Sequence, residues 1–112
     1  MITRIAVVLT ILSTSPAWPA GVSFLDGNKL HNYCSYNKPN IMYGICAGYT
    51  IGVTDSLSKG PVSGFNACIP QGPVVEQLVD FVIKWLGDNP TNRHYSGEEV
   101  VAWALSEAFP CR

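Results

Sequence analysis

The sequence predicts an all-α protein, a small domain of four helices or more that is stapled by two disulfides. Three observations support this fold class. Two stretches near the C-terminus carry apolar residues at helical spacing between clear start and stop signals. The chain of 112 residues suffices for one small domain and opens with a pattern typical of an export signal. Its four cysteines are an even number, as expected where disulfides form.

The first 20 residues are predicted to be a signal peptide, which leaves residues 21–112 as the domain. Arg4 precedes an apolar run over residues 5–12, which has the length of a signal-peptide core and is too short to span a bilayer. The preference for small residues favours cleavage after Ala17 over cleavage after Ala20 without deciding between them. We therefore expect an exported, soluble protein with no membrane segment once the signal is removed.

Two helices are expected in the first half of the domain. A short helix over residues 29–34 follows two candidate capping residues, Asp26 and Asn28. A longer helix over about residues 40–58 follows the turn-forming residues around Pro39. Both predictions rest on caps and apolar spacing.

The longer helix carries a stripe of glycines at every fourth position: Gly44, Gly48 and Gly52. Each interior glycine costs up to about 1 kcal/mol relative to alanine, so a compensating contact is expected. The interpretation that we favour is close backbone approach by another helix of the same fold. The alternative is a flat groove for a second subunit or a partner.

Residues 58–72 are predicted to form the longest loop after the signal peptide, because turn-forming residues dominate them. Cys68 fixes the far end of this loop, which allows the loop to be both exposed and stiff. Phe65 either tucks back into the core, which we slightly favour, or stands out as an apolar anchor.

The third helix is expected over residues 73–86, where nine apolar residues recur at helical spacing. Gly72 is the expected cap, Pro73 fits the first turn, and residues 87–90 end the helix.

The fourth helix is expected over residues 96–109. Ser96 and Glu99 are spaced as a capping box, and Pro110 ends the helix. A short connection makes the third and fourth helices antiparallel neighbours, so the start of one lies beside the end of the other.

The four cysteines allow three disulfide pairings. The expected helix positions favour Cys34 with Cys46 and Cys68 with Cys111, which would contribute about 3 and about 4 kcal/mol on the loop-entropy model. A zinc site is the rival interpretation, but the sequence has no Cys-x-x-Cys pair and no nearby histidine pair. We expect no metal and no cofactor.

Charge and motif content argue against several function classes. The formal net charge is −1, with acids and bases interspersed, which disfavours binding to nucleic acid or to a membrane surface. The two histidines, His31 and His94, lie in different segments, and an arrangement of His94 with Asp55 and Ser56 is not required by any spacing. We therefore expect a protein without catalytic residues, and rank a small hydrolase last.

Four ordered segments carry a resemblance to a known family: residues 46–55 (Cys-Ala-Gly-Tyr-Thr-Ile-Gly-Val-Thr-Asp), 68–72, 93–94 and 104–111. Together they resemble the Tai/Rap family of type VI amidase immunity proteins over nearly the whole mature chain. The resemblance implies a small all-helical periplasmic protein, a homodimer, that binds and blocks a peptidoglycan amidase effector delivered by a type VI secretion system. The matched residues belong to the scaffold, so no contact residue is transferred.

The loop is the segment in which we expect partner binding. Lys59 would lie on the rim, Val62 or Phe65 would be the apolar anchor, and Asn66 completes the set, because a stapled loop loses little entropy on docking. The leading hypothesis is an immunity protein that occludes the amidase active site. The alternative is a periplasmic helper or chaperone-like protein with no toxin partner.

Overall fold

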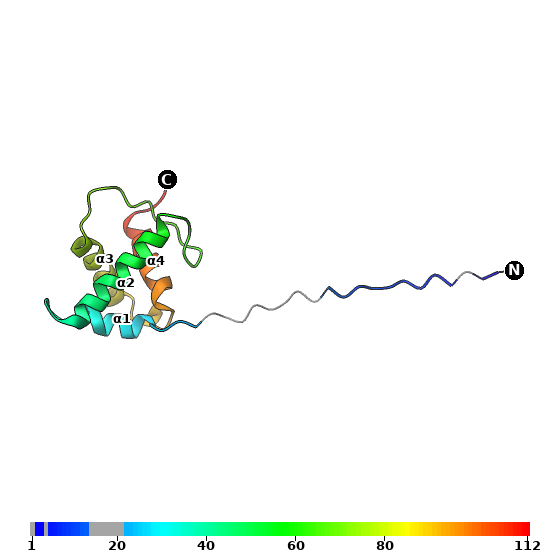
Figure 1. Cartoon of the computed structure of the whole chain (residues 1–112), viewed down its shortest axis with the longest axis horizontal. Coiled ribbons are helices and arrows are strands. Elements are labelled where there is room, and N and C mark those ends of the chain that lie inside the picture. Colours follow the sequence, from blue (N-terminus) through cyan, green and yellow to red (C-terminus); the bar gives the residue numbers. More distant parts are fainter. Residues whose placement is uncertain (1, 4, 14–21) are drawn as a thin grey trace.

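Helices dominate the described part of the chain. The computed structural model describes residues 2–3, 5–13 and 22–112. Its elements are α1 (Gly27–Cys34), α2 (Ile41–Leu57), α3 (Val75–Asp88), the 3-10 turn η1 (Pro90–Asn92) and α4 (Gly97–Ala108) (Figure 1). Those described ranges contain two isolated β-bridges and no strand. The all-α prediction is confirmed, and all four expected helices are present.

Residues 5–13 belong to the predicted signal peptide. They form neither helix nor strand, and their side chains are exposed. The two expected cleavage sites, after Ala17 and after Ala20, lie outside the described residues. The signal peptide and its boundary stay predictions.

The first two helices begin where their capping residues predict. The side chain of Asp26 accepts a hydrogen bond from the backbone N–H of Lys29 at 2.8 Å and caps α1. Asn40 does the same for the N–H of Met42 at 2.8 Å and caps α2. Each cap satisfies an N–H group that the first turn of a helix leaves free.

The third helix begins two residues later than predicted. Gly72 has a φ of +126°, so it turns the chain before the helix starts. Val74 is the N-cap residue, and its backbone N–H donates to Oε1 of Gln77 at 3.0 Å. The expectation that Gly72 caps the helix and Pro73 lies in its first turn is therefore wrong.

The fourth helix begins at the predicted place by a different mechanism. Ser96 is the N-cap residue, but its side chain makes no capping hydrogen bond. The N–H of Gly97 donates instead to the carbonyl of Leu25 at 2.7 Å, beside a bridge between Asp26 and Ser96. The predicted capping box is wrong: the hydroxyl of Ser96 donates to the carboxylate of Glu98 and accepts no bond from the N–H of Glu99.

The core lies between the α3–α4 hairpin and the pair of α1 and α2. In Figure 1, α2 crosses α3 and α4, with which it is in contact, and α1 packs mainly against α2. All four helices contribute fully buried side chains: Leu30, Cys46, Thr50, Val79, Val82, Leu86, Val100, Val101 and Leu105. This single core fixes the outward face of each helix.

Both predicted disulfides are confirmed. Cys34–Cys46 joins the end of α1 to α2 with a Cα–Cα distance of 5.1 Å, and both residues are buried. Cys68–Cys111 joins the segment before α3 to the chain after α4 with a Cα–Cα distance of 5.0 Å, and both residues are exposed. The backbone N–H of Cys68 also donates to the carbonyl of Phe109 at 2.8 Å. The end of the loop before α3 and the chain after α4 are thus fastened together.

Candidate functional site

The outward face of α2 is neutral and apolar over most of its length. The buried side of this helix repeats at three- and four-residue intervals through Cys46, Thr50, Val53 and Leu57. The exposed residues on its other side are small or aliphatic until Asp55: Ile41, Gly44, Ile45, Gly48, Ile51 and Gly52. Ile41 is 76% exposed. We call this set the α2 face.

The glycine stripe is not packed against another helix of the fold, which was the interpretation that we favoured from the sequence. A Cβ built on Gly44, Gly48 or Gly52 would have no neighbouring atom within 4 Å. No other helix among the described residues therefore approaches the stripe, and the interpretation as an internal helix contact is wrong. The alternative, a groove for a second subunit or partner, stays a prediction and fits the open face.

The predicted loop contains a tight hairpin. The N–H of Val62 donates to the carbonyl of Phe65 at 3.0 Å, and the N–H of Phe65 donates to the carbonyl of Val62 at 2.9 Å. Ser63 and Gly64 between them have φ values of +48° and +81°, as the tightest hairpin turns require. These paired hydrogen bonds hold the tip of the loop, which agrees with the expectation of a stiff, exposed segment.

Phe65 lies against the core. Its ring stacks on that of Trp103, with 5.3 Å between ring centroids and 18° between ring planes. Trp103 in turn contacts the ring of Trp85 at 5.1 Å. The structure shows Phe65 folded back against the core, where its contact with Trp103 supports the hairpin. Whether Phe65 also contributes to partner binding stays a prediction.

The other three predicted site residues lie on two sides of the hairpin. Lys59 and Asn66 are exposed and line a hollow of about 590 Å³, which also includes Asp55 and both residues of the Cys68–Cys111 disulfide. Val62 is half-buried and lines a different groove along α2. The loop therefore brings Lys59 and Asn66 together and separates Val62 from them.

The groove beside Val62 runs over the glycine stripe. It has a volume of about 480 Å³ and is lined by Gly48, Tyr49, Gly52, Val53, Ser56, Val62 and Glu98. Because two glycines contribute no side chain, the helix backbone itself is accessible in the groove. Val62 continues the groove onto the hairpin, so the α2 face and the hairpin form one surface.

Glu98 and Tyr49 are the groove residues that sequence reasoning missed. The hydroxyl of Tyr49 donates to Oε2 of Glu98 at 3.1 Å, across 49 positions of sequence. Gly97 makes this contact possible, because a Cβ at Gly97 would lie 2.7 Å from the hydroxyl oxygen of Tyr49. From the sequence, Glu98 is indistinguishable from an acid that stabilises the start of a helix. No local pattern pairs it with Tyr49.

Glu98 is held in its charged form. Burial, the strongest single influence, would raise its pKa, but hydrogen bonds to the carboxylate together keep the pKa below its usual value. Their donors are its own backbone N–H and the side chains of Ser96, Tyr49 and Ser23. For Tyr49, burial and the charge of Glu98 raise the pKa to about 12. At neutral pH the pair is a carboxylate and a neutral phenol donor.

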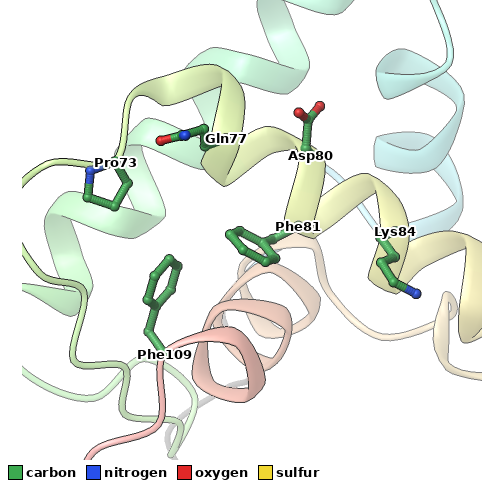
Figure 2. Close-up of a pocket in the computed structure, with 6 residues that line it drawn as sticks. All are labelled: Pro73, Gln77, Asp80, Phe81, Lys84 and Phe109. Atoms are coloured by element: carbon green, nitrogen blue, oxygen red, sulfur yellow. The ribbon is translucent and has the colours of Figure 1, made fainter.

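A second hollow, of about 450 Å³, lies on the other side of the domain between α3 and the end of α4 (Figure 2). Phe81 and Phe109 face one another there, edge to face, with 5.3 Å between centroids. Asp80 and Lys84 flank Phe81 on α3, and Pro73 and Gln77 complete the lining. Unlike the groove on α2, this hollow has one acidic and one basic side chain at its edge.

The side chains considered for catalysis or metal binding are engaged locally. Nδ1 of His94 lies 2.9 Å from the carbonyl oxygen of Thr91. The neighbouring Arg93 donates from Nε to the carbonyl of Leu86 at 2.6 Å. Across the described ranges, no group of three or more His, Cys, Asp and Glu side chains is placed to hold a metal ion.

Among the described helices, none has both the length and the apolar character needed to span a bilayer.

Comparison with known proteins gives one result at the level of the family. A family model described as Rap1a immunity proteins matches residues 26–111, which include all four helices, both disulfides and the hairpin. No curated protein matches the chain.

Proposed function

The chain belongs to the Rap1a immunity protein family, which acts against type VI secretion effectors, and we propose that it binds a peptidoglycan amidase effector and occludes its active site. The binding surface in this proposal is the α2 face together with the hairpin at residues 62–65. Its target would be an incoming amidase that cuts peptidoglycan peptides.

The single observation that carries the proposal is the open, uncharged surface on α2. Large exposed apolar patches, of more than a few hundred Å², commonly mark protein–protein contacts in soluble proteins. Here Ile41, Ile45 and Ile51 are exposed on one helix, beside glycines that no other helix of the described fold covers. The core of a protein–protein interface is likewise depleted of charge and well packed.

Rigidity of this surface supports inhibition by occlusion. The Cys34–Cys46 disulfide holds α2 from its buried side, and the stack of Phe65 on Trp103 holds the hairpin. A surface that is already ordered loses little conformational entropy on binding. It can therefore fill the cleft of an enzyme without first having to fold.

We place this function in the periplasm. Peptidoglycan lies there, disulfides form there, and the predicted signal peptide would direct the chain there. Mass analysis of the protein recovered from the periplasm is expected to show an N-terminus at Trp18 or Gly21. A chain that keeps residues 1–17 would contradict export by signal cleavage.

The experiment that tests the proposal is titration of a purified amidase. A purified type VI amidase effector that the mature protein captures is mixed with increasing amounts of the mature protein, and release of peptidoglycan fragments is measured. We expect hydrolysis to stop at a one-to-one ratio of binding sites. Full hydrolysis in the presence of excess protein would overturn the proposal. Suppression of aggregation of unfolded clients without amidase inhibition would favour the helper function instead.

The proposal includes a homodimer. Phe81 is 42% exposed on α3, with Asp80 and Lys84 of opposite charge on either side (Figure 2). Two copies related by a twofold axis near Phe81 would place each Asp80 near the partner copy's lysine at position 84. Sedimentation over a dilution series is expected to show a dimer that Phe81→Glu converts to a monomer. A monomer at every concentration would remove the dimer from the proposal.

A further inference from the structure

The groove on α2 contains one formal charge in an otherwise neutral lining. Of its lining residues, Glu98 is ionised, Tyr49 and Ser56 are neutral polar residues, and the rest are glycine or valine. The ion pair found in the described part of the chain joins Lys84 to Asp88, on a different helix. Within that part, Glu98 therefore has hydrogen-bond donors but no cation.

The position of this carboxylate is fixed by residues from three segments. Oε2 accepts from the hydroxyl of Tyr49 on α2 at 3.1 Å and from Oγ of Ser23, in the segment before α1, at 3.4 Å. Gly97 leaves the space that the Tyr49 hydroxyl occupies. A charge that is oriented before binding costs less to use in an interface than one on a free side chain.

We infer that the groove receives an arginine side chain of the amidase effector, with its guanidinium group against Glu98 and its methylene stem along Gly48 and Gly52. This inference rests on the proposed function and names the chemistry of the partner at that surface. The stem would contact the helix backbone that the two glycines leave open, and the hairpin residue Val62 would cover its other side.

Arginine fits this groove better than lysine does. Its planar guanidinium is weakly hydrated, is attracted to a carboxylate and stacks on aromatic rings, and Tyr49 supplies a ring in the groove lining. A lysine ammonium is more strongly hydrated and would lose more on entering a largely apolar groove. Charge complementarity therefore selects a cationic segment of the partner, with arginine at the point of contact.

Glu98 also lies in the first turn of α4, where any acid stabilises the helix. A contribution to the start of α4 would be shared by Glu99, which lies in the same turn, carries the same charge and does not line the groove. Glu99 is therefore a control for that contribution. The hydrogen bond from Tyr49 belongs to Glu98 alone, so the free energy of unfolding of each variant is measured beside its affinity.

The test compares Glu98→Gln with Glu99→Gln in the mature protein. Affinity for the same purified amidase effector is measured by calorimetry at low and at high salt. Removing one partner of a desolvated charge pair is expected to weaken binding roughly 30-fold or more for Glu98→Gln. Glu99→Gln should stay within about threefold of the wild type. The dependence of Kd on salt should be smaller in Glu98→Gln than in the wild type.

The outcomes separate the two proposals. If the wild type does not bind the amidase, the proposed function fails. If the wild type binds and Glu98→Gln binds as well as Glu99→Gln does, the arginine site is overturned and the function stands.

Salt dependence of the wild type provides a measurement that needs no folded variant. If Glu98→Gln unfolds, a wild-type Kd that does not change with salt overturns the inference, and a Kd that rises with salt supports it.

Discussion

The outward faces of α2 and α3 differ although both helices pack against the same core. Along α3, Glu76, Asp80, Lys84 and Asp88 point away from the core at four-residue intervals, and Lys84 pairs with Asp88 at 2.6 Å. Phe81 is the exposed aromatic ring between them. Along the α2 face, glycine and isoleucine occupy the equivalent side, and the first charge is Asp55.

This difference shows that burial against the core does not determine the outward side of a helix. The charges of α3 remain hydrated without a partner, and its ion pair is an ordinary surface pair. The α2 face combines exposed aliphatic residues with three glycines that lower helix stability. We therefore assign the stable protein contact to α2, and to α3 no more than the small contact around Phe81.

The largest expected effect concerns the exposed disulfide that supports α3. The double variant Cys68→Ala/Cys111→Ala is expected to lower the free energy of unfolding by about 4 kcal/mol, since the bond spans 43 residues and its cysteines are exposed. Urea denaturation measures the loss. Affinity for the amidase should be kept at temperatures where the variant is folded, because Cys34–Cys46 holds α2 and the stack of Phe65 on Trp103 holds the hairpin. A folded variant with lost affinity would contradict this separation between the two helices.

The next effect is on binding and compares one lysine on each face. Gly48→Lys fills the groove and places a cation beside Glu98, so the Kd for the amidase should rise about 100-fold or more, equivalent to roughly 2.7 kcal/mol. Asp80→Lys on α3 should leave this Kd within about threefold of the wild type. Calorimetry with both variants measures the two Kd values. Equal effects of the two lysines would remove the distinction between the faces.

Alanine substitutions test the same difference between α2 and α3 with a smaller change in the side chain. Gly48→Ala on α2 and Gly87→Ala on α3 both place a methyl group in open space, so each should raise the free energy of unfolding by up to about 1 kcal/mol. Only Gly48→Ala should weaken amidase binding. Thermal unfolding and affinity measured on the same samples test this. Unchanged binding by Gly48→Ala would mean that the partner does not approach the backbone of α2.

The smallest effect is a dependence of stability on pH. Folding lowers the pKa of Glu98, so the ionised carboxylate stabilises the fold above its ordinary pKa of 4.5. That contribution is lost as the pH falls through the lower pKa of the folded state. The melting temperature of the wild type should therefore approach that of Glu98→Gln on acidification below about pH 4.5. Parallel curves for the two proteins would show that Glu98 is not coupled to folding.

The sequence predicts the scaffold because its signals are local. Asp26 and Asn40 cap the helices that follow them, and the ends of α3 and α4 bring Cys68 to Cys111 as their spacing requires. Other contacts depend on a distant segment. At the start of α4, the N–H of Gly97 donates to the carbonyl of Leu25, a contact across more than 70 positions that no local pattern contains.

The candidate site is only partly predictable for the same reason. The glycine stripe is visible in the sequence, but whether a helix covers it depends on the packing of the whole domain. Val62 is predicted from loop chemistry and does line the groove, whereas Tyr49 and Glu98 meet across 49 positions. Pairing of this kind requires the fold itself.

The most direct measurement of the central claim is hydrogen exchange of the protein free and bound to the amidase. We predict slower exchange on binding for the backbone amides of residues 44–56 and 62–65, because the partner would cover the α2 face and the hairpin. The amides of residues 76–88 in α3 should be unchanged at the same protein concentration. Protection confined to α3, with none along α2, would contradict the assignment of the binding surface.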